Sequence, residues 1–386
     1  MLWAKIIFGF SALCLFYIFL GYPILISILS KIFPYKNNFS QIGKDEYALP
    51  SVSLLIPAYN EEQIIEDKIR NILDLDYPSE KLEMVIASDG SDDKTNEIVK
   101  NYFAKVKLIE YKKREGKTTL LNKTVPKLKN EIIVFSDASA MLNRDAIKKV
   151  VSHFQDESIG SVSGKYLVFN IDDTSRTKGE GIYWKYETYI KRCESKYYSI
   201  LGAHGALYAL RKKLFKPLPI DAINDDYILP MYSVEQGFRA VYDSSAISEE
   251  FATTSIHGEI KRRIRISVGN FQQLFLLKSL LNPFKGRIAF EFLSHKFLRS
   301  FSFVFFISLF YSNLFIIAPV FHYILFLQIL FYLSSLLGFL PAKMNCKIKI
   351  FTLPFYIFLI TFASLLGFYK FLFGEQKTTW EKSDEV

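Results

Sequence analysis

Acidic residues lie next to several short apolar segments of this 386-residue chain. Asp89 ends the segment LEMVIASD, Asp92 and Asp93 follow it closely, and Asp137 follows EIIVFS. Carboxylates that converge on one place repel each other unless a cation or hydrogen-bond donors lie between them. A divalent metal that carries a phosphorylated ligand meets this need, because Mg²⁺ and Mn²⁺ prefer oxygen ligands. The pattern therefore indicates a cation-assisted site for a phosphorylated ligand.

The segments around these acids alternate between apolar and amphipathic runs. VSLLIP, LEMVIAS, VKLIEY and EIIVFS are each followed by a segment with helical periodicity. In the first of these, Ile65, Ile69 and Ile72 share one face, and we expect Asn60 to cap the helix. Short apolar strands separated by helices predict an α/β fold with a mostly parallel sheet. Ligands of such sheets bind beyond the carboxyl ends of the strands, where the acids should meet.

Composition restricts the class of protein. The chain is long enough to bury a large hydrophobic core, and its many apolar residues and mixed charges exclude a disordered chain. The net charge of +9 fits nucleic acid, anionic lipid or a phosphorylated substrate equally. Three separated cysteines, Cys14, Cys193 and Cys346, predict neither a disulfide framework nor a zinc site. No G-x-G-x-x-G and no complete P-loop occurs, which disfavours a dehydrogenase or a P-loop nucleotidase.

Long uncharged segments predict membrane spans. Residues 6–29 carry no charge, and about 24 residues suffice to cross a bilayer as one helix. A cleaved signal peptide is the alternative, but no small-x-small site follows. The nearly uncharged segment 297–340 is long enough for two spans with Pro319 between them, and 350–373 predicts another. Basic residues beside these segments predict a multi-pass protein of the inner (cytoplasmic) membrane, with the middle of the chain in the cytoplasm.

An ordered series of short motifs resembles one enzyme family. P-A-Y-N-E, S-D-G-S-x-D, G-K-x-x-x-L-N, F-S-D-A-S, G-A-x-G-A-L-Y-A-L-R, N-D-D-Y and R-R-I-R follow one another between Val52 and Gln273. This series, with its flanking apolar segments, resembles the membrane-bound family-2 glycosyltransferases, relatives of cellulose, hyaluronan and poly-N-acetylglucosamine synthases. The resemblance implies a GT-A-like (Rossmann-like) domain and an inverting hexosyl or N-acetylhexosaminyl transfer. The donor would be a nucleotide sugar, expected to be UDP-linked, and the acceptor a saccharide or a lipid-linked molecule.

The expected organisation has five parts. They are a transmembrane helix at 1–33, a cytosolic GT-A-like glycosyltransferase domain at 48–270, an amphipathic interfacial segment at 271–296, about three transmembrane helices at 297–373, and a polar tail at 374–386. The basic run 261–265 precedes an amphipathic apolar stretch, which is typical of a helix on a membrane surface. We therefore expect membrane lipid, and no nucleic acid, as its partner.

The resemblance assigns Asp89 to the nucleotide base. The family uses an aspartate there to accept a hydrogen bond from the uracil N3–H, and a carboxylate suits an imide donor. Pro57, Ala58, Tyr59 and Glu61 would border the same base and ribose pocket. The alternative for Asp89 is an ordinary turn, since Asp-Gly-Ser is also turn chemistry.

The diphosphate would lie near Asp137. The resemblance makes Asp137 the first acid of the family's D-x-D motif, which holds ribose and a Mg²⁺ or Mn²⁺ ion. The second acidic position is occupied by Ser139, and a hydroxyl is a poorer ligand for a hard cation. Lys117, at the start of a helix, and Arg265 would contact the phosphates. The alternative for Lys117 is a solvated lysine of the basic run Lys112-Lys113-Arg114.

The acceptor side would centre on Asp226. By the resemblance, Asp226 is the general base that takes the proton of the acceptor hydroxyl, and inversion needs one carboxylate opposite the leaving group. Asp225 would orient it or cap a helix, and a doubly acidic helix start is the alternative for both. Gly205 belongs to a turn of small residues that lets the acceptor approach.

Departures from the family pattern keep other functions open. The family's Q-x-x-R-W motif is absent, since the only tryptophans are Trp3, Trp184 and Trp380. This weakens the case for processive synthesis. A degenerate domain acting as a membrane scaffold or nucleotide-sugar sensor is one alternative, and a polyprenyl-phosphate glycosyltransferase is another. An active enzyme would work in polysaccharide or glycolipid biosynthesis, alongside polysaccharide synthesis or export partners.

Overall fold

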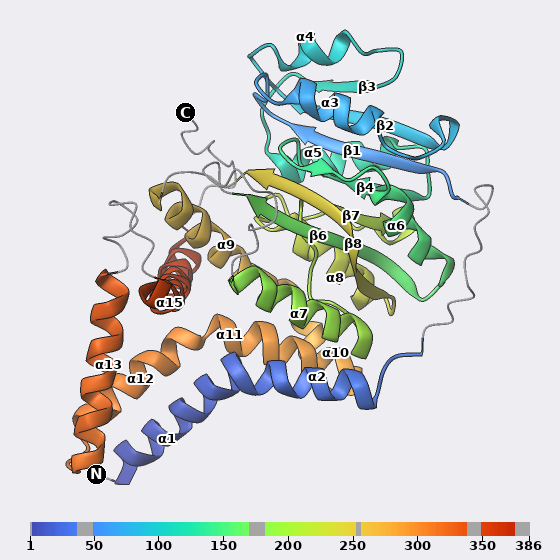
Figure 1. Cartoon of the computed structure of the whole chain (residues 1–386). Coiled ribbons are helices and arrows are strands. Elements are labelled where there is room, and N and C mark those ends of the chain that lie inside the picture. The colour runs from blue at the N-terminus through green and yellow to red at the C-terminus, as the bar shows by residue number, and fades with distance from the viewer. Residues whose placement is uncertain (1, 37–48, 170–181, 252–255, 338–348, 375–386) are drawn as a thin grey trace.

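Figure 1 presents a computed structural model of the protein, which describes residues 2–36, 49–169, 182–251, 256–337 and 349–374. The tail 375–386 and most of the basic segment between the last two apolar helices, 338–348, lie outside the described residues.

One eight-stranded sheet forms the centre of the molecule, in the order β3-β2-β1-β4-β7-β6-β8-β5. Its strands are β1 (Val52–Ala58), β2 (Leu82–Asp89), β3 (Lys107–Tyr111), β4 (Ile132–Phe135), β5 (Met141–Leu142), β6 (Ile159–Phe169), β7 (Tyr208–Arg211) and β8 (Arg239–Phe251). The first four are parallel, whereas β7 runs antiparallel to both β4 and β6, and β5 antiparallel to β8. The sheet is therefore mixed. β6 pairs parallel with β8, so most strands run in one direction, as expected, and only β5 and β7 run the other way.

Helices cover both faces of the sheet. They include α3 (Ile65–Leu73), α4 (Thr95–Lys100), α5 (Lys117–Thr124), α6 (Ala146–Ser152) and α8 (Asp225–Glu235). Alternate residues of β1 enter different cores: Leu55 packs with α5 and α8, while Leu54 and Ile56 pack with α3 and α6. Each core is a continuous cluster of buried apolar side chains, as the apolar strands predicted. The sheet therefore holds the residues at its carboxyl edge on a rigid base.

The loops after β1 and β2 are joined by Asn60. Its Nδ2 donates to Asp92 Oδ1 at 2.6 Å, and its Oδ1 accepts from the Asp92 backbone N–H at 3.0 Å. Asn60 has φ of 54°, in the left-handed region that asparagine tolerates better than most residues. Helix α3 begins later, and its N-cap, Ile64, makes no side-chain capping bond. The expectation that Asn60 caps this helix is therefore wrong.

Apolar helices lie on one side of the sheet domain (Figure 1). They are α1 (Leu2–Phe16), which continues through a π-helical turn into α2 (Tyr22–Ile32), then α10 (Arg287–Glu291), α11 (Leu298–Ser300), α12 (Ser302–Leu314), α13 (Pro319–Leu337) and α15 (Lys349–Phe373). Within the described ranges, Leu2–Ile32 is the one helix that is long and apolar enough to cross a membrane. A second candidate is the pair Arg287–Ser300 and Ser302–Leu314, which is bent by 56°. The described apolar stretches 319–335 and 357–373 are shorter, so one or two spans, rather than the four expected, meet this test.

Two further helices connect the sheet domain to the apolar helices. α7 (Ile182–Tyr197) packs along α2, and α9 (Ile256–Leu276) packs along α15. The Phe271 ring on α9 is buried and lies 5.0 Å from the Phe368 ring on α15. The amphipathic stretch expected from residue 271 is thus the end of a longer helix, and one of its faces is covered by protein.

Candidate active site

Lys117 lies at the centre of the acidic residues. It is the first residue of α5, and its Nζ is 2.8 Å from Asp137 Oδ1 and 3.3 Å from Asp225 Oδ1. Burial alone would lower the pKa of Lys117, but the three carboxylates around it raise the pKa above its usual value. The ammonium group therefore stays charged and balances carboxylates that would otherwise repel one another. The sequence predicted these residues separately, and the structure brings them together.

Asp226 is held by the turn that contains Gly205. The Gly205 backbone N–H donates to Asp226 Oδ2 at 2.9 Å, and the Ala203 N–H donates to the Asp226 carbonyl at the same distance. Burial and the neighbouring Asp225 carboxylate raise the pKa of Asp226 to about 6. A carboxylate with this pKa is ionised near neutral pH and still basic enough to accept a proton.

Gly205 also separates Asp226 from Asp137. A Cβ at position 205 would lie 2.7 Å from Asp137 Oδ2 and 3.5 Å from Asp226 Oδ2. The absence of a side chain therefore leaves the space between the two carboxylates open. The role of Gly205 in admitting the acceptor stays a prediction.

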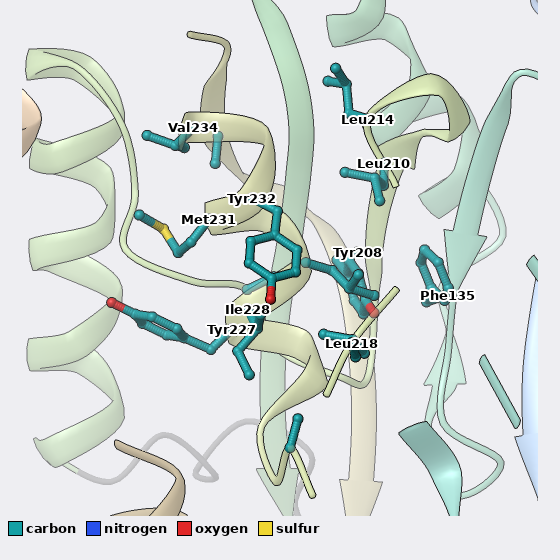
Figure 2. Packing of buried hydrophobic residues seen from close by; sticks show 14 of the residues in the cluster. Phe135, Tyr208, Leu210, Leu214, Leu218, Tyr227, Ile228, Met231, Tyr232 and Val234 are labelled. Atoms are coloured by element: carbon teal, nitrogen blue, oxygen red, sulfur yellow. The ribbon is translucent and has the colours of Figure 1, made fainter. Parts of the chain in front are cut away.

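Asp225 points into the protein rather than toward solvent. It is 6% exposed, burial raises its pKa, and its Oδ2 has no hydrogen-bond partner among the described residues. Behind it, the apolar residues of α8 pack against Tyr208 of β7, whose ring stacks on Phe135 of β4 at 4.6 Å (Figure 2). This packing fixes the start of α8 against the end of β4, and thereby fixes Asp225 and Asp226 relative to Asp137.

Arg265 approaches the same carboxylates from α9. Burial lowers the pKa of its guanidinium group, while Asp226 and Asp225 oppose that shift. The position of α9 is fixed by Gly269, where a Cβ would lie 2.5 Å from Asn224 Nδ2, and by Asn224 Nδ2, which donates to the Ile266 carbonyl at 3.2 Å. A positively charged side chain thus faces the acidic group from the side of the apolar helices.

Asp89 ends β2 farther along the same edge. Its two carboxylate oxygens accept from the backbone N–H groups of Glu115 and Gly116 at 2.9 and 2.8 Å. Gly90 has φ of 70°, and a Cβ there would lie 2.6 Å from Arg114 N. Asp89 therefore also fixes the loop before Lys117, a contact that sequence reasoning did not predict. Each oxygen keeps lone pairs for a ligand.

The residues expected around the base lie beside Asp89. Pro57 is half-buried at the end of β1, Ala58 is buried, and the Tyr59 ring stacks on the Arg114 guanidinium at 3.9 Å. The Glu61 backbone N–H donates to Thr95 Oγ1 at 2.7 Å. The binding roles assigned to these residues stay predictions.

Ser139 contacts a residue that sequence reasoning missed. Its hydroxyl donates a short hydrogen bond to Glu250 Oε1 on β8, and the Tyr166 hydroxyl on β6 donates to Glu250 Oε2 at 2.5 Å. Glu250 lies 111 positions from Ser139 in the chain, and no sequence spacing links them. Only the pairing of β5 with β8 brings the two together.

The donor atoms suit a divalent cation that arrives with a diphosphate. In the part of the chain that the structure describes, no group of three or more His, Cys, Asp or Glu residues could hold a metal ion alone. However, Asp137 is 37% exposed at its side chain, and Asp225 Oδ2 lacks a partner. Mg²⁺ usually binds one or two carboxylates and takes its remaining ligands from substrate phosphates and water. These residues therefore fit an ion that is shared with the substrate.

Comparison with known proteins identifies the domain. Residues 53–218 match the model of glycosyl transferase family 2. The chain carries a family-2 glycosyltransferase domain. This domain contains Asp89, Lys117, Asp137, Ser139 and Gly205, while Asp225, Asp226 and Glu250 follow it.

Curated relatives share part of the chain. It is 27% identical over 264 residues to probable glycosyltransferase YdaM of Bacillus subtilis (strain 168), covering 65% of this chain and 62% of that protein. It is 36% identical over 139 residues to beta-monoglucosyldiacylglycerol synthase of Trichormus variabilis, covering 34% of this chain and 30% of that protein. The chain thus spans less than two thirds of the length of these relatives.

A solved structure supports the fold. The mannosyltransferase PcManGT from Pyrobaculum calidifontis, in complex with GDP-Man and Mn²⁺, matches 96% of this chain and 100% of its own with a TM-score of 0.71. The sequence identity is 20%. The match confirms the GT-A-like α/β fold.

Proposed function

We propose that this protein is a membrane-bound, inverting glycosyltransferase. It transfers a hexosyl or N-acetylhexosaminyl group from a UDP-sugar to a hydroxyl group of a saccharide or lipid-linked acceptor. The observation that carries the proposal is geometric: the Gly205 N–H holds the Asp226 carboxylate at 2.9 Å, beside Lys117, which pairs with Asp137 and Asp225. A scaffold would not need this arrangement, because buried carboxylates cost stability.

Asp226 is proposed as the general base. Gly205 N–H holds Asp226 Oδ2 at 2.9 Å, which leaves the other oxygen to accept the proton of the acceptor hydroxyl. Burial and the Asp225 carboxylate raise the pKa of Asp226, which makes it a stronger base than an exposed aspartate. As the acceptor oxygen attacks the anomeric carbon, its proton passes to Asp226 and the sugar–phosphate bond breaks on the opposite face.

Lys117 and Arg265 are proposed to bind the leaving diphosphate. Lys117 would exchange one carboxylate partner for a phosphate oxygen, and Arg265 would offer its fork of N–H donors from α9. A divalent cation bound at Asp137 would neutralise the negative charge that develops on the diphosphate. Asp89, with Pro57, Ala58, Tyr59 and Glu61, would bind the base.

The apolar helices are proposed to hold the catalytic domain at the cytoplasmic face of the membrane. The 31-residue helix Leu2–Ile32 supports this, because large apolar side chains along it are exposed, among them Phe10, Leu13 and Phe16. α7 and α9 connect the sheet domain to the apolar helices. One relative is named for a diacylglycerol product, which supports a lipid-linked acceptor.

A donor panel tests the proposal. The detergent-purified chain is incubated with UDP-glucose, UDP-N-acetylglucosamine, UDP-galactose or GDP-mannose in the presence of Mn²⁺, and nucleotide release and lipid-extractable products are measured. We expect one UDP-sugar to react, EDTA to stop the reaction, and NMR to find an inverted anomeric centre. Binding without turnover for every donor and acceptor would favour a sensor, and turnover with polyprenyl phosphate as sole acceptor would identify a polyprenyl-phosphate transferase.

A further inference from the structure

The carboxylate of Glu250 lies where the chain lacks an acidic residue at position 139. Ser139 stands two positions after Asp137, on the loop that leads from β4 to β5. Because Met141 of β5 pairs with Glu249 of β8, the end of β8 lies beside this loop. The Ser139 hydroxyl donates its hydrogen bond to Glu250, a residue of a different strand. The Glu250 carboxylate, from a distant part of the chain, therefore places a negative charge next to Ser139.

Both partners are held in place. Tyr166 donates to the second oxygen of Glu250 at 2.5 Å, and the cations Lys68 and Arg262 lie near enough to interact electrostatically with Glu250. Under the loop, the fully buried Lys68 donates to Ser136 Oγ at 2.7 Å and to the Ala140 carbonyl. The loop that carries Asp137 and Ser139 is thus fixed from below by Lys68 and from the side by Glu250.

This contact changes what the Ser139 hydroxyl can bind. A hydroxyl group has one donor proton and two acceptor lone pairs. When the proton is donated to a carboxylate, the lone pairs face away and gain electron density, so the oxygen becomes a better ligand for a hard cation. Such supporting hydrogen bonds commonly orient metal ligands and raise their basicity.

We infer that Glu250 is a positioning residue that makes Ser139 a ligand of the divalent cation accompanying the nucleotide diphosphate. This inference rests on the proposed function. It assigns Asp137 and Ser139 to the cation directly and Glu250 to the cation through Ser139. Asp137 and Glu250 together carry the same charge as the two acids of a D-x-D motif, but Asp137 follows β4 and Glu250 lies on β8.

Mn²⁺ binding in the presence of UDP tests the inference without relying on turnover. Electron paramagnetic resonance of the full-length protein in detergent gives the fraction of Mn²⁺ bound at each concentration. We expect Glu250→Gln to weaken Mn²⁺ binding by about 10- to 100-fold, the usual effect of removing a supporting partner. Glu249→Gln is the matched control, because Glu249 is adjacent on β8 and its side chain contacts neither Ser139 nor Tyr166 in the described structure. It should leave Mn²⁺ affinity unchanged.

Double variants separate positioning from a general loss of structure. If Glu250 acts through Ser139, then Glu250→Gln added to Ser139→Ala should cause no further loss of Mn²⁺ affinity. Ser139→Asp should restore affinity to the Glu250→Gln protein, because the missing charge returns at position 139. Thermal unfolding of each variant is measured in parallel, and we expect unchanged midpoints for Glu250→Gln and Glu249→Gln.

The outcomes distinguish the inference from the proposed function. If the wild-type protein binds Mn²⁺ with UDP and Glu250→Gln binds it equally well, the inference is overturned and the proposed function stands. Additive losses in the double variant would also overturn it, because Glu250 would then act independently of Ser139. If the wild-type protein binds no Mn²⁺ with either UDP or GDP, the inference and the cation dependence of the proposed function both fail.

Discussion

Replacing Gly205 by alanine should disable the site without unfolding the protein. The added Cβ would lie 2.7 Å from Asp137 Oδ2, whereas ordinary contact begins at 3.4 Å, so the carboxylate has to move by about 0.7 Å. Gly205 is not among the described glycines with positive φ, so alanine adds no backbone strain there. Displacing a positioned group by about 1 Å costs on the order of 10²-fold in rate. We therefore expect kcat/KM for the sugar donor to fall by about 10- to 100-fold.

Steady-state release of UDP, measured with thermal unfolding of the same preparation, provides the assay. Gly237→Ala serves as the control, because Gly237 has φ of 92° and no atom within 4 Å of an added Cβ. Alanine there should cost about 1 to 2 kcal/mol of stability through backbone strain alone and leave kcat/KM unchanged below the unfolding transition. A Gly205→Ala protein whose kcat/KM stays within about threefold of the wild type would refute the placement of Asp137 beside the reacting sugar.

Three further predictions concern charge. Because Asp226 has to be ionised to act as a base, kcat should fall about tenfold per pH unit below the pKa of about 6, as a pH–rate profile would detect. Lys117→Gln removes a cation that lowers the pKa of Asp226, so the acidic limb of that profile should move to higher pH by about one unit, and an unmoved limb would contradict the placement. Burial opposes ionisation of Glu187 on α7, but Arg299, 2.6 Å away, and other cations lower its pKa to about 2. This stabilisation is present above pH 4.5 and lost as the pH falls toward 2. Glu187→Gln should therefore lower the free energy of unfolding, measured with denaturant at pH 7, by about 3 kcal/mol. A loss of the same size at pH 3 would contradict the assignment.

The first half of the fold follows from local patterns. Each apolar strand from β1 to β4 and the helix after it have short-range signals, and the rule that ligands bind at the carboxyl edge placed Asp89 and Asp137 at one edge of the sheet. Asp225 and Asp226 were assigned to the site only through the family resemblance. The antiparallel pairing of β7 with β4 and β6 joins segments that are far apart in the chain. Such pairings depend on long-range packing that local periodicity does not show, so the sequence did not predict that β5 and β7 run antiparallel to their neighbours.

Individual side chains show the same limit. Asparagine is a common N-cap residue of helices, but a tertiary contact with Asp92 holds Asn60 in a left-handed conformation. Lys117 was expected at phosphate, and its present partners come from two other elements. Glu250 carries no motif, and its contact with Ser139 exists only because β8 ends beside the loop after β4. Long-range contacts of this kind require the folded chain.

The apolar runs correspond to apolar helices, but fewer of these helices than expected are long and apolar enough to cross a membrane. The break near Pro319 was expected and is present between α12 and α13. The bend of 56° after Ser300 was not expected; it lies beside Arg299, at the start of the long apolar run. Counting spans from composition alone therefore overestimated those that the described helices support.

Asp226→Asn tests the central claim most directly. The variant is compared with Asp221→Asn, an exposed aspartate of the loop before α8, in a sugar-transfer assay together with UDP binding. A general base contributes about 10²- to 10⁴-fold, so we predict a loss of that size in transfer for Asp226→Asn, with UDP binding retained and Asp221→Asn active. Transfer by Asp226→Asn at the wild-type rate would contradict the assignment of Asp226 as the catalytic base.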